Sequence, residues 1–517
     1  MAVAAKVPSV LERVASYRED LSLKLPIIDG NTREAAVFRQ IEASLPEGDF
    51  IELSGADTEQ ILNQLDQGIP VIAQGYFRCQ LGGFEFSGYA DLLVRDGYEI
   101  YVREDGSAAA RRTSGDSPGR NYQPWDVKNS SSGSEKYELQ LAAYHRALQQ
   151  VGFASDIDMG IVLGFNRGIV RYPVAAALEH LDEAIGSLAR ILGAASPSQL
   201  DAAFVSDWAC DKESVCGKAY CTYPKLCAAT RIEQDVIEQL HGLHASHGIA
   251  LRNAGVTTVA GLAGFAAPPQ LDGLKPEYSE RYWNAAQVMV AERVHGKAIR
   301  TLISGKPSVP LENEQDLYFD VEWANPVDSD QPLVFMFGSV TASQGFEVFT
   351  TADRSGELAA FDDFLDFALA KLLVNPQMHI YHFHSPEPQQ LRKLAVRYGG
   401  HRSADVEALC ERMIDLRVIA MATFVPGCAS YSIKDLEHYY DADEQLNRTD
   451  LVAGGADAML QFHLYQQALA TGSVDEANSI MSEIAAYNRD DCLSTKLLAD
   501  WLRGLNFERA GQILYWN

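Results

Sequence analysis

Apolar and polar residues divide the first 200 positions into helices and strands. Residues 31–45 have helical spacing, residues 70–80 and 84–95 predict a hairpin that turns at Gly82 and Gly83, and residues 98–105 are expected to continue its sheet. A loop from Asp105 to Arg120 then precedes a strand at Asp126, a helix at 135–150 and two strands within 157–174. This order predicts a mixed sheet with helices on it.

The second half of the chain begins with helical patterns at 230–302. Gly255 and Gly261 would mark the turns of a helix-hairpin-helix element there, although an ordinary helical connector fits the same residues. A linker rich in Pro and Ser leads to a strand at 315–323, a strand running into a helix at 378–391, and a helix at 484–498. The fold class is therefore α/β multidomain.

Length and charge limit the possible functions. A chain of 517 residues with 47% apolar residues supports two or three domains, each with its own core. We expect a soluble, cytoplasmic protein, because no apolar run reaches the roughly 20 residues of a membrane helix and the start lacks a signal-peptide pattern. The net charge of -27 excludes a uniformly basic nucleic-acid surface, so phosphate attraction would have to come from local patches.

Candidate chemistry in the first half centres on Asp126 and Lys128, which stand two apart on a predicted strand and so share a face. Asp91 lies in the predicted strand 84–95, and Gln140 and Tyr144 are one helical turn apart. Asp91 and Asp126 could hold Mg2+ or Mn2+, while Lys128 positions water or stabilises negative charge. Alternatively, Asp126 and Lys128 form only a surface ion pair on an edge strand.

These motifs resemble the RecB-like branch of the PD-(D/E)XK nucleases, which implies a restriction-endonuclease-like mixed-sheet domain. The residues that carry the match are Gly88, Asp91, Asp126, Lys128, Gln140, Leu141 and Tyr144. By the same resemblance, Glu34 would be a further acid on the first helix, with Glu42 as its competitor.

Four cysteines fall within 18 residues, at Cys210, Cys216, Cys221 and Cys227. Such a cluster in an intracellular chain indicates a metal site before disulfides, and Zn2+ and a [4Fe-4S] cluster are equal candidates. Four buried thiols or two disulfides remain the alternative. RecB-like nucleases often carry such a cluster, although one ligand then lies far upstream, where this chain offers only Cys79.

The second half contains another set of acids. Asp320 and Glu322 share one face of a strand, Glu387 begins a helix, and Tyr487 precedes Asp491 by one helical turn. This set resembles the DEDD exonucleases of the RNase H-like fold, in their Tyr-bearing, YprB-like form. The resemblance implies that the four acids hold two cations and that Tyr487 orients the attacking water. Asp490 is the rival to Asp491, Asp415 is a further nearby candidate, and a degenerate site kept for packing is the alternative.

The predicted order is a RecB-like nuclease domain at 1–200, a helical Cys-cluster connector at 201–305 and an RNase H-like exonuclease domain at 306–517. It resembles a family of predicted bacterial RecB-like nucleases. We therefore expect a metal-dependent DNA nuclease whose second site removes nucleotides from a 3′ end. The alternatives are an RNA-directed exonuclease and an inert nucleic-acid-binding scaffold that serves a helicase or a defence complex in trans.

Overall fold

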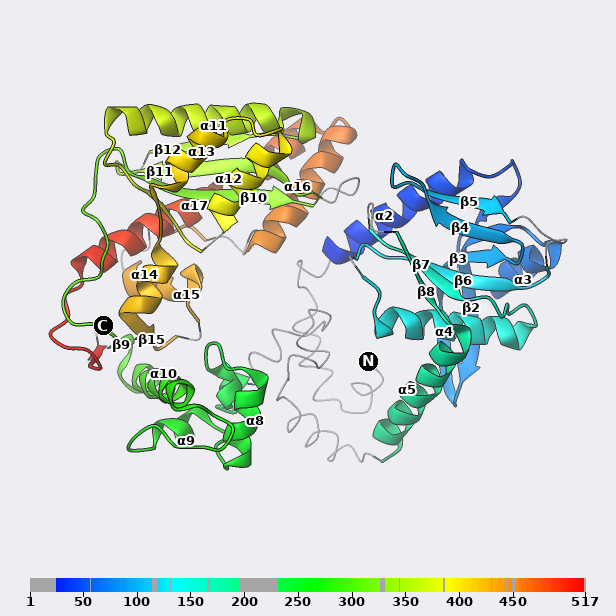
Figure 1. Ribbon diagram of the computed structural model, residues 1–517, viewed down its shortest axis with the longest axis horizontal. Helices are drawn as coiled ribbons and strands as arrows, with labels where there is room; N and C mark the ends of the chain where they lie inside the picture. The colour runs from blue at the N-terminus through cyan, green and yellow to red at the C-terminus, as the bar shows by residue number, and fades with distance from the viewer. Residues whose placement is uncertain are drawn as a thin grey trace. The chain divides into compact units, whose positions relative to one another are not determined.

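The structure is a computed structural model that describes residues 25–55, 57–113, 119–130, 132–164, 168–194, 231–325, 331–343, 345–384, 386–428, 430–441, 445–448, 452 and 454–515 (Figure 1). It contains two compact units, one built from residues 25–194 and the other from residues 231–324 and 333–515. The boundaries of the three predicted domains stay predictions.

A six-stranded mixed sheet forms the first unit, as the sequence predicts. Its strands in spatial order are β1 (Phe50–Glu52), β2 (Val71–Leu81), β3 (Phe84–Arg95), β6 (Tyr122–Val127), β7 (Met159–Val162) and β8 (Ile169–Tyr172). The pairs β1/β2 and β6/β7 are parallel and the others antiparallel. Gly82 and Gly83, both with positive φ, make the predicted tight turn between β2 and β3.

Helices cover both faces of this sheet. Helix α2 (Leu25–Glu42) packs Val37 and Ile41 against Leu92 of β3, whereas α3 (Thr58–Gln67) and α4 (Glu135–Val151) pack on the opposite face. Helix α5 (Val174–Ala194) follows β8 and packs on α4 and β7. The sheet therefore has a core on each side.

The segment after β3 differs from its prediction. Strand β4 (Tyr98–Val102) does not extend the six-stranded sheet but pairs with β5 (Ala108–Arg112), in a region expected to be a loop. Three small side chains, Ala108–Ala110, are buried beside α2 and allow the close approach. Alanine has little intrinsic strand preference, so this hairpin depends on tertiary packing.

A five-stranded sheet forms the core of the second unit. Its strands in spatial order are β12 (Phe346–Thr350), β11 (Leu333–Thr341), β10 (Leu317–Ala324), β13 (Ile380–His382) and β14 (Met413–Asp415). Strands β10 to β12 are antiparallel to their neighbours, and β13 and β14 continue the sheet in parallel with β10.

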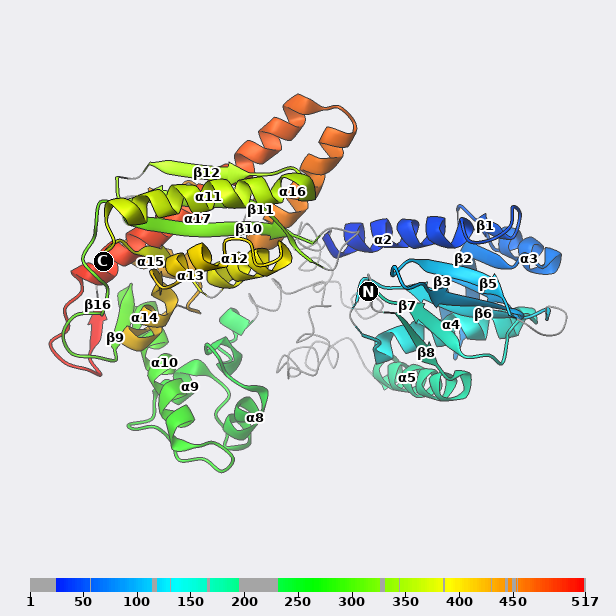
Figure 2. The ribbon, with the colours of Figure 1, turned by 45° about the horizontal axis from the view of Figure 1, so that its top comes forward.

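Helices sandwich this second sheet (Figure 2). One face carries α11 (Arg354–Val374), α12 (Pro386–Arg397) and α13 (Ser403–Cys410). The other face carries α14 (Leu416–Thr423), α15 (Ile433–Tyr440), α16 (Gly455–Ala470) and the long α17 (Val474–Gly504). Helix α17 crosses β10 and β11, which brings its acidic residues next to those of β10.

The segment before β10 is helical and belongs to the same compact unit. It contains η4 (Ile237–Gln239), α8 (Ala245–Asn253), α9 (Val259–Ala263) and α10 (Pro276–His295). Strand β9 (Ala298–Thr301) then pairs with both β15 (Phe424–Pro426) and β16 (Ile513–Tyr515), which fastens the helices to the five-stranded-sheet domain.

The two glycines of the helix-hairpin-helix prediction have different positions. Gly255 has a φ of +81° and lies in the turn between α8 and α9, as predicted. Gly261 does not mark a turn: it lies within α9 and donates its N–H to Oγ1 of Thr258, the N-cap residue.

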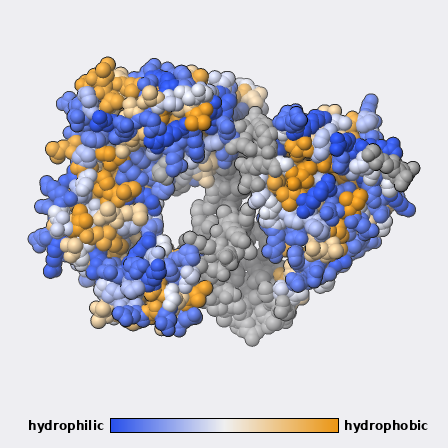
Figure 3. Space-filling model, in the orientation of Figure 1, coloured by the Kyte–Doolittle hydropathy of each residue, from blue (hydrophilic) through white to orange (hydrophobic). Residues whose placement is uncertain are grey.

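Most of the described surface in the view of Figure 3 is hydrophilic, and apolar residues form small separate groups. Among the described residues, no helix combines the length and the apolar character needed to cross a membrane.

Candidate active sites

The first candidate site joins Asp91 of β3 to Asp126 of β6, which lie on adjacent antiparallel strands. Oδ2 of Asp91 accepts a hydrogen bond of 2.8 Å from the backbone N–H of Val127. Asp91 is 8% exposed and Asp126 only 1%. Because β6 is central in the sheet, between β3 and β7, the alternative of a surface ion pair on an edge strand is wrong.

Lys128 completes this pair of acids, with its Nζ 2.6 Å from Oδ2 of Asp126. Burial lowers the pKa of Lys128, but attraction to Asp126 and Asp91 outweighs burial and leaves that pKa raised. The ammonium also lies 5.6 Å from the centre of the Tyr137 ring. A protonated lysine is therefore held beside two carboxylates.

Glu34 of α2 belongs to the same cluster. Its burial, followed by the nearby Asp126 carboxylate, raises the pKa of Glu34 to about 7. Its Oε1 accepts a hydrogen bond from Gln74, a β2 residue whose φ of +57° is unusual for a residue other than glycine. Glu42, the competing acid, is exposed at the end of α2.

Gly88 of the first motif and Tyr144 of the third motif lie against each other in the structure. A Cβ at position 88 would lie 2.8 Å from Oη of Tyr144, so glycine makes room for the phenol. Tyr144 packs edge-on against Phe86 at 5.4 Å and hydrogen-bonds to the side chain of Gln140. Leu141 is fully buried in the core beside α5, where it fixes the helix that carries both residues.

The acids of this first cluster are crowded without a balancing number of cations. Burial, then Asp126, and more weakly Glu34 raise the pKa of Asp91 well above its ordinary value. A divalent cation would relieve this repulsion, and carboxylate oxygens are the ligands that Mg2+ and Mn2+ prefer. Asp91 and Asp126 offer oxygen donors that suit such an ion, but within the described residues they are not part of a group of three or more ligands whose atoms lie within 4.8 Å of one another.

The second candidate site is formed by β10 and α17. Asp320 and Glu322 of β10 meet Asp491 of α17, and one ligand atom from each lies within 4.8 Å of the others. These three acids line a cavity of about 200 Å³, and Glu387 and Tyr487 also border it. Acids more than 160 positions apart in sequence thus converge.

Crowding of these acids changes their protonation. Burial, then the charge of Asp491, raises the pKa of Glu322 to about 8. Burial and the neighbouring Glu322 raise the pKa of Asp320 well above its ordinary value. As in the first cluster, the donor set fits a divalent cation.

Glu387 takes a different position from the other three acids. It lies near the start of α12 and is 3% exposed, but it is not part of the group whose ligand atoms lie within 4.8 Å. Its Oε2 is 3.1 Å from Nδ1 of His382 in β13. His382 is therefore engaged locally with Glu387.

Three residues at the second site are absent from the predicted set. Asn488 donates a hydrogen bond of 2.7 Å from Nδ2 to Oδ2 of Asp320. Lys434 of α15 places Nζ 3.3 Å from Oη of Tyr487. Arg448 forms ion pairs with Asp491 and Glu437. Asn488 could have been found from its place next to Tyr487 in the helix, whereas Lys434 and Arg448 carry no comparable sequence signal.

The rival acids have other roles. Asp490 accepts a hydrogen bond of 2.9 Å from the backbone N–H of Asn447. Asp415 is the N-cap of α14 and accepts from the backbone N–H of Arg417 at 2.8 Å. Asp491 is the helix α17 acid that faces Asp320.

The four cysteines predicted to bind metal, Cys210, Cys216, Cys221 and Cys227, lie outside the described residues. Cys79, named above as the only upstream cysteine, is a free, partly buried thiol in β2. The zinc and iron–sulfur assignments stay predictions.

Comparison with known proteins identifies one part of the chain. A family model described as RNase_H superfamily matches residues 317–503, from the start of β10 to the end of α17. No curated protein and no solved structure matches the chain. The resemblance of the first unit to RecB-like nucleases rests on the residues above and stays a prediction. Residues 317–503 form an RNase H-like domain, and this superfamily indicates a nuclease-type function that depends on divalent metal.

Proposed function

We propose that this protein is a divalent-metal-dependent nuclease that hydrolyses DNA phosphodiester bonds. The observation that carries the proposal is the convergence of Asp320, Glu322 and Asp491 within an RNase H-like domain. We assign 3′-to-5′ exonuclease activity to this site and a second cleavage activity to the cluster around Asp126. RNA is the alternative substrate.

At the exonuclease site, Asp320, Glu322 and Asp491 would hold the cation, with Glu387 at the border of the cavity. A bound divalent cation supplies polarisation of the scissile phosphate and acidification of water. Burial and the adjacent Asp491 raise the pKa of Tyr487, so its phenol stays protonated and can donate a hydrogen bond to a water molecule. Asn488 holds Asp320 in place.

At the first site, Asp91 and Asp126 would hold the cation, with Glu34 as a third acid. The protonated side chain of Lys128 can stabilise negative charge that develops on the phosphate. Tyr144 and Gln140 lie on one turn of α4 beside the acids, where they can orient the substrate. Mg2+ or Mn2+ suits both sites.

The proposal also includes a second cofactor and a protein partner. The four-cysteine segment would bind Zn2+ or a [4Fe-4S] cluster, and a helicase acting in trans would supply unwound strands. Because the chain carries a net charge of -27, binding of DNA must rely on local cationic residues.

End-labelled DNA and RNA strands, single and double, test the proposal with Mg2+ or Mn2+. Asp320→Asn should abolish stepwise shortening from the 3′ end, whereas Lys128→Ala should remove any separate cleavage and leave the shortening intact. Asp490→Asn is the matched control, since it changes the neighbouring acid, which bonds to Asn447 instead. Unchanged cleavage in both Asp320→Asn and Lys128→Ala would contradict the proposal.

One observation favours an inert scaffold as the second candidate function. Arg448 forms an ion pair with Asp491, and this pair satisfies a carboxylate that a cation would need. If wild-type protein binds strands but cuts none with either metal, the scaffold function replaces the nuclease.

A further inference from the structure

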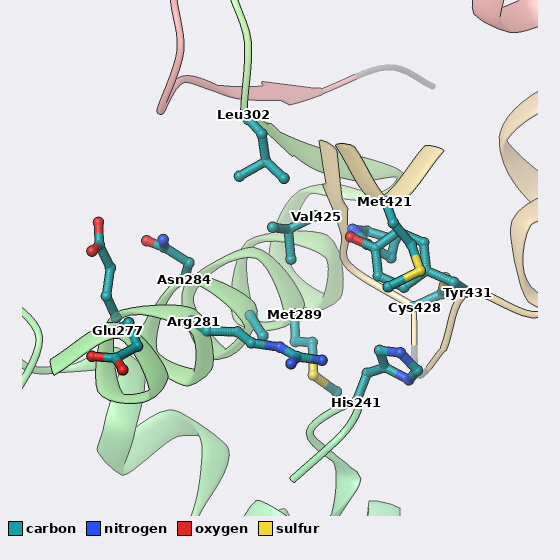
Figure 4. A pocket seen from close by; sticks show the side chains of 13 residues that line it. His241, Glu277, Arg281, Asn284, Met289, Leu302, Met421, Val425, Cys428 and Tyr431 are labelled. Atoms are coloured by element: carbon teal, nitrogen blue, oxygen red, sulfur yellow. The ribbon is translucent and has the colours of Figure 1, made fainter. Parts of the chain in front are cut away.

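A second and larger cavity lies in the same compact unit as the exonuclease site. It has a volume of about 440 Å³ and lies between α10, β15 and the segment before α8 (Figure 4). This volume is in the range of pockets that hold small organic ligands. None of its lining residues takes part in either acid cluster.

Apolar and aromatic side chains form one part of its wall. Met289 of α10, Met421 of α14 and Val425 of β15 line the cavity. The rings of His241 and Tyr431 meet edge to face, with centroids 5.3 Å apart. Such a wall suits a flat aromatic ligand such as a nucleobase, because aromatic and thioether groups pack well on its faces.

Arg281 lines the cavity beside the acids Glu277 and Glu280, and Arg417 lies near enough to act on His241 in the same wall. Arg281 extends toward His241 and away from Glu277, and Gly242 leaves the room that its guanidinium occupies (Figure 4). Arg417 precedes Met421 by one turn of α14. Both arginines lower the pKa of His241, after the larger effect of burial, and Asp435 is the acid that opposes them.

Neither guanidinium forms an ion pair within the part of the chain that the structure describes. By contrast, Arg397, Arg402, Arg448 and Arg503 of the same unit all pair with acids. Guanidinium groups match phosphate oxygens well, so these two arginines can bind an anion although Glu277 and Glu280 also line the cavity.

Neighbouring residues of the chain line this cavity and the cavity of the exonuclease site. Tyr431 lines this cavity, and Ile433, two residues later, lines the cavity of the three acids. The Cα atoms of two residues so spaced lie within about 7.6 Å of each other. The two cavities therefore share the segment 431–433 as a common border.

We propose that this cavity is a nucleotide-binding subsite for single-stranded nucleic acid whose end occupies the exonuclease site. One unstacked base packs on Tyr431, His241 and Met289, and Arg281 and Arg417 bind the adjoining phosphates. The inference rests on the proposed nuclease function and adds to it a preference for single strands several nucleotides long.

Binding by the full-length protein tests this inference in the presence of EDTA, where no cleavage occurs. The probe is a fluorescein-labelled single strand about 12 nucleotides long, within the usual range of single-strand binding sites. Arg281→Ala should weaken binding about tenfold, reduce the slope of log K against log salt by about 0.7, and do so for DNA and RNA alike. Arg417→Ala should act in the same direction.

Arg392→Ala is the matched control, because Arg392 is an exposed arginine on α12 that pairs with Glu407. It should change the affinity less than twofold. If Arg281→Ala and Arg417→Ala bind the strand as Arg392→Ala does, the subsite does not exist.

A small substrate separates this inference from the proposed function. The p-nitrophenyl ester of thymidine 5′-monophosphate is a single nucleotide that cannot span both cavities, so its hydrolysis depends on the acid site alone and Arg281→Ala should hydrolyse it at the wild-type rate. Loss of its hydrolysis in Asp320→Asn, together with unchanged strand binding in Arg281→Ala, would overturn the subsite and keep the nuclease. The reverse pattern would overturn the nuclease and leave the strand-binding site.

Discussion

At the scale of single residues, the absence of a side chain at Gly88 makes room for a neighbour in the first site. Gly88 leaves the space that the Tyr144 hydroxyl fills, and the acids lie next to this contact. Gly88 is therefore needed for the close approach of the Tyr144 hydroxyl and not for its backbone conformation, because its φ does not lie in the left-handed region.

Gly88→Ala should destabilise the protein by about 1 to 3 kcal/mol, the usual cost of adding a methyl group to a packed site. The double variant Gly88→Ala/Tyr144→Phe should recover much of this loss, since it removes the clashing oxygen. Urea unfolding followed by tyrosine fluorescence measures both. An equal loss in the single and double variants would show that the hydroxyl is not the obstacle.

Lys434 contacts Tyr487 at the second acid cluster, and we expect it to act through that residue. Its ammonium lies 3.3 Å from the phenol oxygen and 4.7 Å from the ring centre. Lys434→Met keeps the stem and removes the charge, so we expect kcat to fall about 100-fold with little change in KM.

A double-variant comparison checks that assignment. Lys434→Met and Tyr487→Phe should be far from additive, because both disturb the same hydrogen bond. Lys434→Arg should restore part of kcat. Fully additive losses would mean that Lys434 works independently of Tyr487.

At the scale of elements, one buried carboxylate joins three parts of the RNase H-like domain. Glu357 of α11 accepts hydrogen bonds from Arg397 of α12, Tyr398 and the backbone N–H of Val334 in β11. Burial raises its pKa, but these hydrogen bonds outweigh burial and leave the pKa of Glu357 below its ordinary value of 4.5.

This lowered pKa has a defined effect on acid stability. A carboxylate with a depressed folded-state pKa stabilises the protein above the unfolded-state pKa, and the stabilisation is lost as pH falls through the folded-state value. Glu357→Gln should cost about 3 to 5 kcal/mol near pH 7, because it removes the buried negative charge that pairs with Arg354 and Arg397.

Thermal unfolding between pH 3 and pH 7 measures the effect of this substitution. The difference between wild type and Glu357→Gln should shrink as pH falls below 4.5. A constant difference across the range would contradict the linkage. Arg392→Ala, which removes an exposed ion pair, should shift stability by less than about 1 kcal/mol.

The elements also show what the sequence could and could not predict. Strand alternation predicts that Asp320 and Glu322 share a face, and helical spacing predicts that Tyr487 and Asp491 do. Both predictions need only the local backbone geometry. Lys434 and Arg448 reach the site from α15 and the residues after it, and their positions depend on tertiary packing. The β4/β5 hairpin was missed for the same reason, since its alanines favour a strand only against α2.

At the scale of the whole molecule, acids gather in two separate compact units. Residues 34 to 126 supply one cluster and residues 320 to 491 the other, so each unit builds its own site from distant segments. The net charge of -27 is in part the charge of these clusters. Under the proposed function, divalent cations would balance part of this charge.

Manganese binding to the full-length chain tests this central claim most directly, with electron paramagnetic resonance to count bound and free Mn2+. Replacing Asp320 by Asn and Glu322 by Gln together should remove at least one bound ion per chain, whereas Asp490→Asn should bind as the wild type does. An unchanged number of bound ions in the Asp320/Glu322 double variant would contradict the account.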